Sequence, residues 1–169
     1  MRRLLDLLYD AAAWLAALAM VGVLAMVLLS IVSRQLDFHV PGTDAYAGYA
    51  MAAAGFLALA HTLKRNEHIR VTLILGRLHG RARRGLEMWA LSAAVLLSAL
   101  FAFYSVRLAI VSYQLNDIST SSDATPLWIP QVAMAVGTVV LLIAFIDEWL
   151  QQLRGRRSLE EPQEALHNE

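Results

Sequence analysis

The sequence contains no cysteine. Disulfide bridges, thiolate nucleophiles and cysteine-bound zinc or iron-sulfur centres are therefore excluded. Charge is also sparse, since Asp, Glu, Lys and Arg make up 17% of the 169 residues. These four residue types are absent from long runs at 11–33, 45–63, 88–106 and 124–146. What remains is a chain whose apolar residues are gathered into blocks rather than spread as in a soluble core.

The four uncharged runs have the lengths of membrane spans. At a rise of about 1.5 Å per residue they extend roughly 28 to 35 Å, which matches a hydrocarbon core of about 30 Å. We therefore predict an all-α integral membrane protein with four transmembrane helices packed as one compact bundle. The membrane domain is expected to cover residues 1–157, and the acidic tail at 158–169 is expected to be disordered.

The basic residues predict an orientation. Of the 14 Lys and Arg residues, 12 lie before the first run, between the second and third runs, or after the fourth. Short cytoplasmic loops keep such residues, so we expect both termini and the middle loop on the cytoplasmic side. A cleaved signal peptide is the alternative for the first run, because Arg2 and Arg3 precede it. The run exceeds the usual apolar length of about 7 to 15 residues, which favours an uncleaved anchor.

Small residues follow one face of the expected second helix. Gly48, Ala52, Gly55 and Leu59 recur at intervals of four, three and four, which predicts a mostly smooth stripe. Helices in lipid associate by close backbone approach, so such a stripe indicates a helix contact. Whether the contact lies within this chain or with a partner protein stays open at this point.

The middle loop contains an amphipathic pattern. Apolar residues recur at helical spacing at Val71, Ile74, Leu75 and Leu78. This pattern predicts an interfacial helix on the inner leaflet, with basic neighbours close to anionic lipid phosphates. The alternative is a short solvated connector.

Ionisable groups at membrane depth usually mark the pathways of carriers and proton relays. No Asp or Glu lies within the four runs, which disfavours small exporters that depend on an intramembrane carboxylate. His61 lies near the end of its run, and we interpret it as an interfacial residue rather than a proton site. The other histidines fall outside the runs, so paired haem ligands are not expected. We expect no catalytic centre, cofactor, metal site or nucleic-acid-binding patch in this chain.

The segment after the second run carries a family resemblance. Residues 63–73 read Leu-Lys-Arg-Asn-Glu-His-Ile-Arg-Val-Thr-Leu, and the most specific part contains His68 and Arg70. Further similarity lies at Arg34, in the Pro-Gly-Thr-Asp of 41–44, and from Ser122 through the Pro-Leu-Trp-Ile-Pro that contains Trp128 and Pro130. Over about residues 10–150 the chain resembles the DctQ-type small membrane subunit of tripartite ATP-independent periplasmic (TRAP) transporters.

One segment departs from the family pattern. Before the second helix the family often has a tryptophan and two adjacent acids, whereas this chain has Gly42, Thr43, Asp44 and Ala45. Only Asp44 carries over. We expect Asp44 to pair with Arg34 near the outer interface, where the reduced dielectric strengthens an ion pair. The alternative is two separately solvated loop charges.

The resemblance implies a role that depends on partners. The small subunit of this family lies beside a large elevator-type subunit in the bacterial inner membrane, and a sodium gradient drives that large subunit. A periplasmic binding protein delivers the substrate, which is expected to be a small carboxylate. The candidate structural or partner-contact residues are Arg34, Asp44, Gly48, Ala52, Gly55, His68, Arg70, Trp128 and Pro130. A membrane anchor for a redox or other enzyme, and a stand-alone carrier, are the alternatives.

Overall fold

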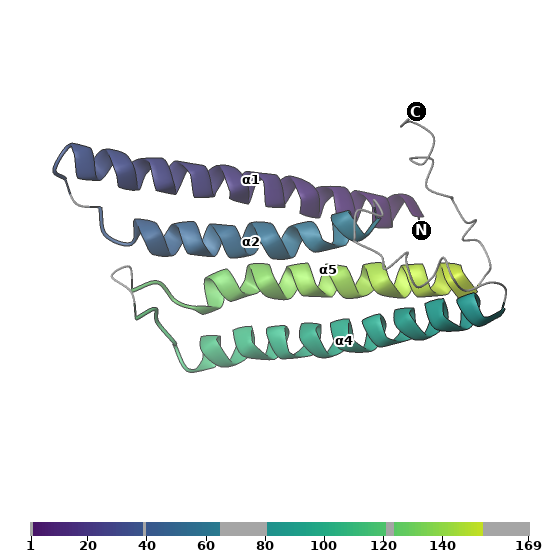
Figure 1. The fold of residues 1–169 in the computed structure, drawn as a ribbon. Helices are drawn as coiled ribbons and strands as arrows, with labels where there is room; N and C mark the ends of the chain where they lie inside the picture. Colours follow the sequence, from purple (N-terminus) through teal and green to yellow (C-terminus); the bar gives the residue numbers. More distant parts are fainter. Residues whose placement is uncertain (1, 39, 65–80, 121–123, 154–169) are drawn as a thin grey trace, which may run out of the picture.

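The computed structural model describes residues 2–38, 40–64, 81–120 and 124–153. Within these ranges the chain forms four helices and no strand, which confirms the predicted all-α class. In chain order the helices are α1 (Arg2–Gln35), α2 (Thr43–Lys64), α4 (Arg81–Gln114) and α5 (Trp128–Leu153). Figure 1 shows them lying side by side. The predicted interfacial helix at 71–78, His68, Arg70 and the tail at 158–169 lie outside the described residues.

Three of these helices are long and apolar enough to cross a membrane. They are found within Leu5–Gln35, Gly85–Gln114 and Trp128–Leu153. The 22-residue α2 is not among them, because polar side chains occupy both of its ends and small or tyrosine residues lower its hydropathy between them. The chain is thus a protein with membrane-spanning helices, and its fourth span stays a prediction.

The helices extend past most of the predicted boundaries. The uncharged run 88–106, for example, lies well inside α4. The exception is α5, which begins at Trp128 rather than at 124. The residues before it pair instead with the preceding loop: the Leu127 amide donates to the Asp117 carbonyl at 2.9 Å, and the Ser119 amide donates to the Thr125 carbonyl at 2.8 Å. This pairing satisfies backbone groups that would otherwise join a helix.

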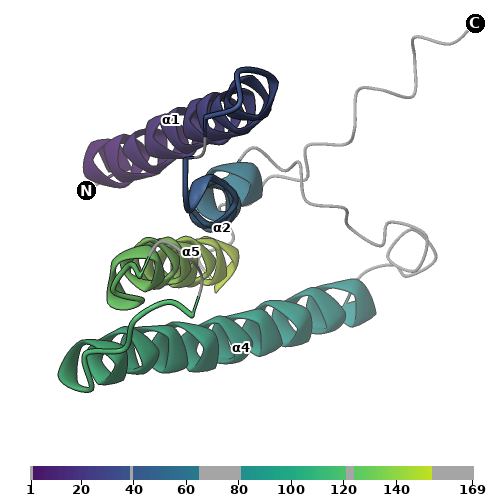
Figure 2. The same cartoon turned by 90° about the vertical axis from the view of Figure 1, so that its left-hand side faces the viewer.

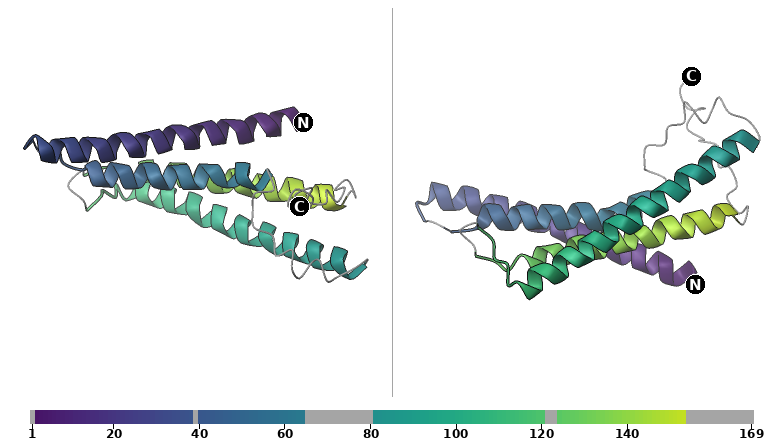
Figure 3. Two further views of the ribbon diagram at one scale, coloured as in Figure 1. Left: turned by 45° about the horizontal axis from the view of Figure 1, so that its top comes forward. Right: turned by 90° about the horizontal axis from the view of Figure 1, so that it is seen from below.

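The helices form an open row and not the compact bundle predicted from the sequence. Substantial contacts join α1 to α2, α2 to α5, and α5 to α4, while α1 and α5 touch only slightly. The view along the helices places α1 and α4 at opposite ends of this row (Figure 2). The row is also twisted, since α1 and α4 incline in opposite senses (Figure 3, right). Because lipid does not drive apolar helices together as water does, an open arrangement leaves no unfavourable surface.

Small side chains fill the contacts between neighbouring helices. The buried residues on α4 include Ser98, Ala102 and Ser105, which lie on one helical face. The Ser98 and Ser105 hydroxyls donate to carbonyl oxygens of the preceding turn, at 3.1 and 2.8 Å. Their polar atoms are thus satisfied within α4 itself. A face built this way lets two backbones approach closely.

α2 and α5 approach each other closely near the middle of their contact. A Cβ atom added at Gly137 would lie 2.5 Å from the carbonyl oxygen of Phe56. Gly137 is itself buried, and its neighbour Thr138 is fully buried. Only glycine permits this separation, because the atom that a larger side chain would meet belongs to the backbone of α2. The contact therefore fixes the spacing at the centre of the row.

We expect Gly137→Ala to separate α2 from α5 and to lower the free energy of unfolding by about 1 to 3 kcal/mol, the usual cost of overpacking. Thermal unfolding in detergent, followed by circular dichroism, measures this loss. Gly85→Ala on α4 is the matched control, because a Cβ there meets no atom within 4 Å. Equal stability of the two variants would contradict the close contact.

Candidate functional site

The turn between α1 and α2 brings two predicted residues together. α1 ends through Asp37, whose φ is 53°, and the Phe38 amide donates to the Ser33 carbonyl at 3.1 Å. Such a left-handed residue is a common way to end a helix. Gly42, with φ of 82°, then turns the chain into α2. A left-handed conformation suits glycine, which has no Cβ to clash.

The predicted ion pair is present at this turn. Arg34 Nη2 lies 3.8 Å from Asp44 Oδ2, and the two side chains are 76% and 83% exposed. The Ser30 hydroxyl also lies 3.5 Å from Asp44 Oδ1. Exposed ion pairs contribute only about 0 to 1 kcal/mol to stability. The pair therefore does little to stabilise the fold, and both charges stay accessible where the end of α1 lies beside the start of α2.

A pocket of about 450 Å³ surrounds this ion pair. Its walls combine the charged pair with Ser33 and Thr43, which are buried, and with the half-buried Val40. The adjoining part of α2 is joined to the loop between α4 and α5, since the Tyr49 hydroxyl donates to Ser119 Oγ at 2.9 Å. The pocket thus sits in a polar surface shared by both loops at this end.

The small-residue stripe of α2 faces away from the other helices. Gly48, Ala52 and Gly55 are all exposed, and a Cβ added at either glycine would meet nothing within 4 Å. Met51 lies on the same side and is 67% exposed. The sequence left open whether this stripe packs within the chain. Among the described residues it does not, so it remains an open surface at the middle of the row.

Trp128 and Pro130 lie in the first turn of α5. The Trp128 ring stacks edge to face on Tyr113 near the end of α4, with ring centres 5.6 Å apart. Such aromatic pairs stabilise by about 0.5 to 1.5 kcal/mol beyond their buried area. Pro130 is tolerated in this turn because the first amides of a helix have no partner within it. Both residues thus shape the loop end of the α4 and α5 hairpin.

At the opposite ends of the helices, α2 and α5 are joined by an ion pair that the sequence did not predict. Lys64 Nζ lies 2.6 Å from Asp147 Oδ2, and the two side chains are 27% and 18% exposed. Gln151 Nε2 also donates to Asp147 Oδ2, at 2.8 Å. The Lys64 ammonium lies 5.3 Å from the centre of the Tyr9 ring, within the range of a cation-π contact. Three helices therefore meet at this group.

His61 lies near this group. Its Nδ1 is 3.9 Å from Asp10 Oδ1, and its side chain is 22% exposed. The contact places His61 at the end of α2, where the sequence predicted an interfacial residue. No cluster of three or more His, Asp or Glu side chains with metal-binding geometry occurs among the described residues. The chemistry of this end is ion pairing between helices.

No local sequence pattern predicts the Lys64 and Asp147 pair, because the two residues are 83 positions apart in the chain. Each simply follows an uncharged run at the same predicted face of the membrane. Two opposite charges that end neighbouring runs are a weak indication of pairing. The sequence alone does not reveal that α2 and α5 are neighbours.

We expect the partly buried pair at Lys64 and Asp147 to stabilise the row more than the exposed pair at Arg34 and Asp44. A double-mutant cycle of Lys64→Met and Asp147→Asn should give a coupling energy of about 1 to 3 kcal/mol in thermal unfolding. The cycle of Arg34→Gln and Asp44→Asn is the matched control, expected at about 0 to 1 kcal/mol. A larger coupling for the exposed pair would contradict this ranking.

Comparison with known protein families identifies the chain. Residues 23–155 match the family described as tripartite ATP-independent periplasmic transporters, DctQ component. No curated protein matches the sequence. The family match covers all of α2, α4 and α5 and the end of α1 that carries Arg34. The chain therefore belongs to the DctQ family, the small component of TRAP transporters.

Proposed function

We propose that this chain is the small permease subunit of a TRAP-type secondary transporter for small carboxylates in the bacterial inner membrane. It scaffolds the large elevator-type subunit and helps to dock the periplasmic substrate-binding protein. Sodium coupling belongs to the large subunit, and substrate does not bind to this chain. The observation that carries the proposal, together with the family match, is the exposed small-residue stripe of α2 in an open row.

The stripe supports a scaffold role because its position suits a second helical protein. A buried stripe would serve only this chain, whereas Gly48, Ala52 and Gly55 are exposed. A face of small residues lets the backbone of another helix approach closely and make many van der Waals contacts, whereas flexible lipid chains do not require such a face. The occupant we propose is a helix of the static part of the large subunit. Contact along the middle of the row would brace that subunit over a broad surface.

The topology we propose has four spans, with both termini and the middle loop in the cytoplasm. α2 lies between α1 and α5, which are both long and apolar enough to span. A helix of 22 residues extends about 33 Å, enough to cross the same hydrocarbon layer. The 12 basic residues at one side support the orientation.

The Arg34 and Asp44 end then faces the periplasm. Its exposed charges contribute little to folding, and they lie in a polar pocket next to two outer loops. Charged residues at the edge of an interface steer a partner and raise its association rate. We therefore assign this end to docking of the binding protein. His68 and Arg70 are proposed partner contacts at the opposite, cytoplasmic side.

We expect Gly48→Leu and Gly55→Leu to abolish the close contact with the large subunit. The amount of co-expressed large subunit that copurifies in mild detergent should fall about tenfold for a loss of about 1.4 kcal/mol in binding. The isolated chain should not become less stable to heat, because a Cβ at either position meets no atom within 4 Å and glycine is a poor helix former. Ala25→Leu on α1 and Ala90→Leu on α4 are controls, since both alanines are exposed on other helices. Full copurification by the glycine variants would refute the proposed contact.

We expect Asp44→Lys to weaken docking of the binding protein. In proteoliposomes with the large subunit, the binding-protein concentration that gives half-maximal uptake should rise about fivefold, as expected for about 1 kcal/mol of lost interaction. The maximal rate should be kept. Asp6→Lys makes the same change at the other, exposed end of α1 and serves as control. A lower maximal rate with unchanged half-saturation would point to transport itself rather than to docking.

A further inference from the structure

One charged residue interrupts the apolar length of α4. The helix is long and apolar enough to cross a membrane within Gly85–Gln114. Between Glu87 and Asp117 the only charged residue in the sequence is Arg107. The residues that follow it in α4, at 108–114, carry no charge. An arginine within a span is costly, and it usually pairs with an opposite charge at the same depth.

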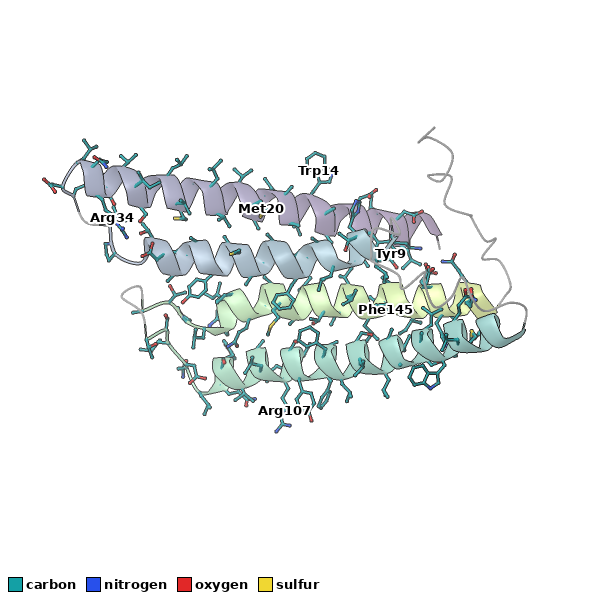
Figure 4. All side chains as sticks on the ribbon, in the orientation of Figure 1. Tyr9, Trp14, Met20, Arg34, Arg107 and Phe145 are labelled. Atoms are coloured by element: carbon teal, nitrogen blue, oxygen red, sulfur yellow. The ribbon has the colours of Figure 1, made fainter. Side chains whose placement is uncertain are left out.

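The Arg107 side chain points out of the row of helices. It extends from α4 on the side away from α5 (Figure 4). The buried face of α4, which carries Ser98, Ala102 and Ser105, packs on α5, and Arg107 lies on the opposite face. Within the part of the chain that the structure describes, its guanidinium has no hydrogen-bond or ion-pair partner. The charge is therefore exposed to whatever lies beyond this edge of the row.

The contact between α4 and α5 indicates how deep this charge lies. On α5 the uncharged stretch 128–146 extends about 28 Å, close to the thickness of a hydrocarbon core. Trp128, at the start of that stretch, stacks on Tyr113 of α4. Tryptophan and tyrosine favour the membrane interface, so this pair marks one boundary of the hydrocarbon on both helices. At about 1.5 Å per residue, Arg107 lies about 9 Å below Tyr113, inside the hydrocarbon.

A lipid head group is poorly placed to neutralise this charge. Side chains on a helix incline toward the N-terminus of that helix. α4 begins at Arg81, so the Arg107 side chain leans away from Tyr113 and toward the middle of the membrane. To reach the nearer head groups it would have to turn back along the helix. A carboxylate on a neighbouring helix at the same depth needs no such turn, and it accepts two parallel hydrogen bonds from a guanidinium.

A second copy of this chain does not supply a carboxylate at that depth. Its Asp and Glu residues all lie outside the uncharged runs at 11–33, 45–63, 88–106 and 124–146. Acids such as Asp44 and Asp147 lie at the ends of helices, in the ion pairs described above. The partner that completes Arg107 is therefore a different membrane protein.

The surface around Arg107 suits a helix of such a protein. Leu100 and Phe103 share its face at intervals of three and four residues, and both are exposed. Val111 continues the same face toward the end of α4 and is also exposed. An apolar helix laid along this face would cover these side chains. It would also keep other polar groups away from the guanidinium, which strengthens its attraction to a carboxylate.

We propose that the outward face of α4 docks a transmembrane helix that carries an Asp or Glu at the depth of Arg107. The guanidinium and that carboxylate form the centre of the contact, with Leu100 and Phe103 packed around them. The inference rests on the proposed function, under which the large subunit supplies this helix. The contact is separate from the small-residue stripe, because α5 lies between α2 and α4.

The first test is photocrosslinking in native membranes that contain the co-expressed large subunit. Phe103→p-benzoylphenylalanine places the crosslinker one turn from Arg107. We expect a crosslink to an apolar segment of the large subunit that contains an Asp or Glu, located by mass spectrometry. Leu24→p-benzoylphenylalanine is the matched control, because Leu24 is equally exposed on α1 at the far edge of the row. It should give no crosslink to that segment.

The second test removes the charge. Arg107→Gln should lower the amount of copurified large subunit about tenfold, whereas the isolated chain should keep its thermal stability because Arg107 has no partner among the described residues. Leu108→Gln is the matched control, since it places the same amide on an exposed position of α4 at the same depth. It should keep full copurification. Arg107→Glu should lose the large subunit as well, and changing the crosslinked acid to Arg should restore it.

The outcomes separate this inference from the proposed function. Unchanged copurification by Arg107→Gln, or equal loss by Leu108→Gln, would overturn the Arg107 contact and leave the proposed function standing. Crosslinks from Phe103→p-benzoylphenylalanine to lipid alone, or to a segment without an acid, would also overturn the contact. Failure of the wild-type chain to copurify with the large subunit would overturn both.

Discussion

The contact between α2 and α5 is the constraint on which the rest of the structure depends. The chain consists of two helical hairpins, α1 with α2 and α4 with α5, and this contact is the main one that joins them. Its centre is the approach of Gly137 to the backbone of Phe56. Its two ends are tied by polar groups, Lys64 with Asp147 on one side and Tyr49 with Ser119 on the other. The hydrophobic effect does not drive helices together in lipid. Close packing and a few polar contacts therefore determine which helices are neighbours.

The open row leaves the small-residue stripe of α2 exposed among the described residues. A closed bundle would bury such residues between its own helices, whereas in this row every helix keeps part of its surface exposed. Most large apolar side chains are accordingly exposed, as expected for a protein whose solvent is a membrane or another membrane protein. The ion pairs among the described residues lie near the ends of the helices. Between those ends the exposed surface is mainly apolar or formed by small residues such as Gly48 and Gly55.

Much of this architecture could be predicted from the sequence, and the failures have physical causes. Uncharged runs located all four helices, because a charge at membrane depth is costly and marks the boundary of a run. The start of α5 at Trp128 was missed because backbone pairing across the loop competes with helix formation. The stripe at Gly48 and Gly55 was found, but small residues indicate only that a close neighbour fits, not which one. Gly137, a single glycine without a repeat, gave no pattern, although a Cβ at this position would meet the backbone of α2.

The lengths of the helices have a consequence for the surrounding bilayer. α1 and α4 each have 34 residues and extend about 51 Å, whereas α2 between them has 22 and extends about 33 Å. The long helices are those at the two edges of the row, and they incline in opposite senses (Figure 3). Tilting is how a helix longer than the hydrocarbon layer fits within it. Because α1 and α4 incline in opposite senses, they cannot both stand along the membrane normal, so at least one edge of the row must cross the bilayer at a tilt.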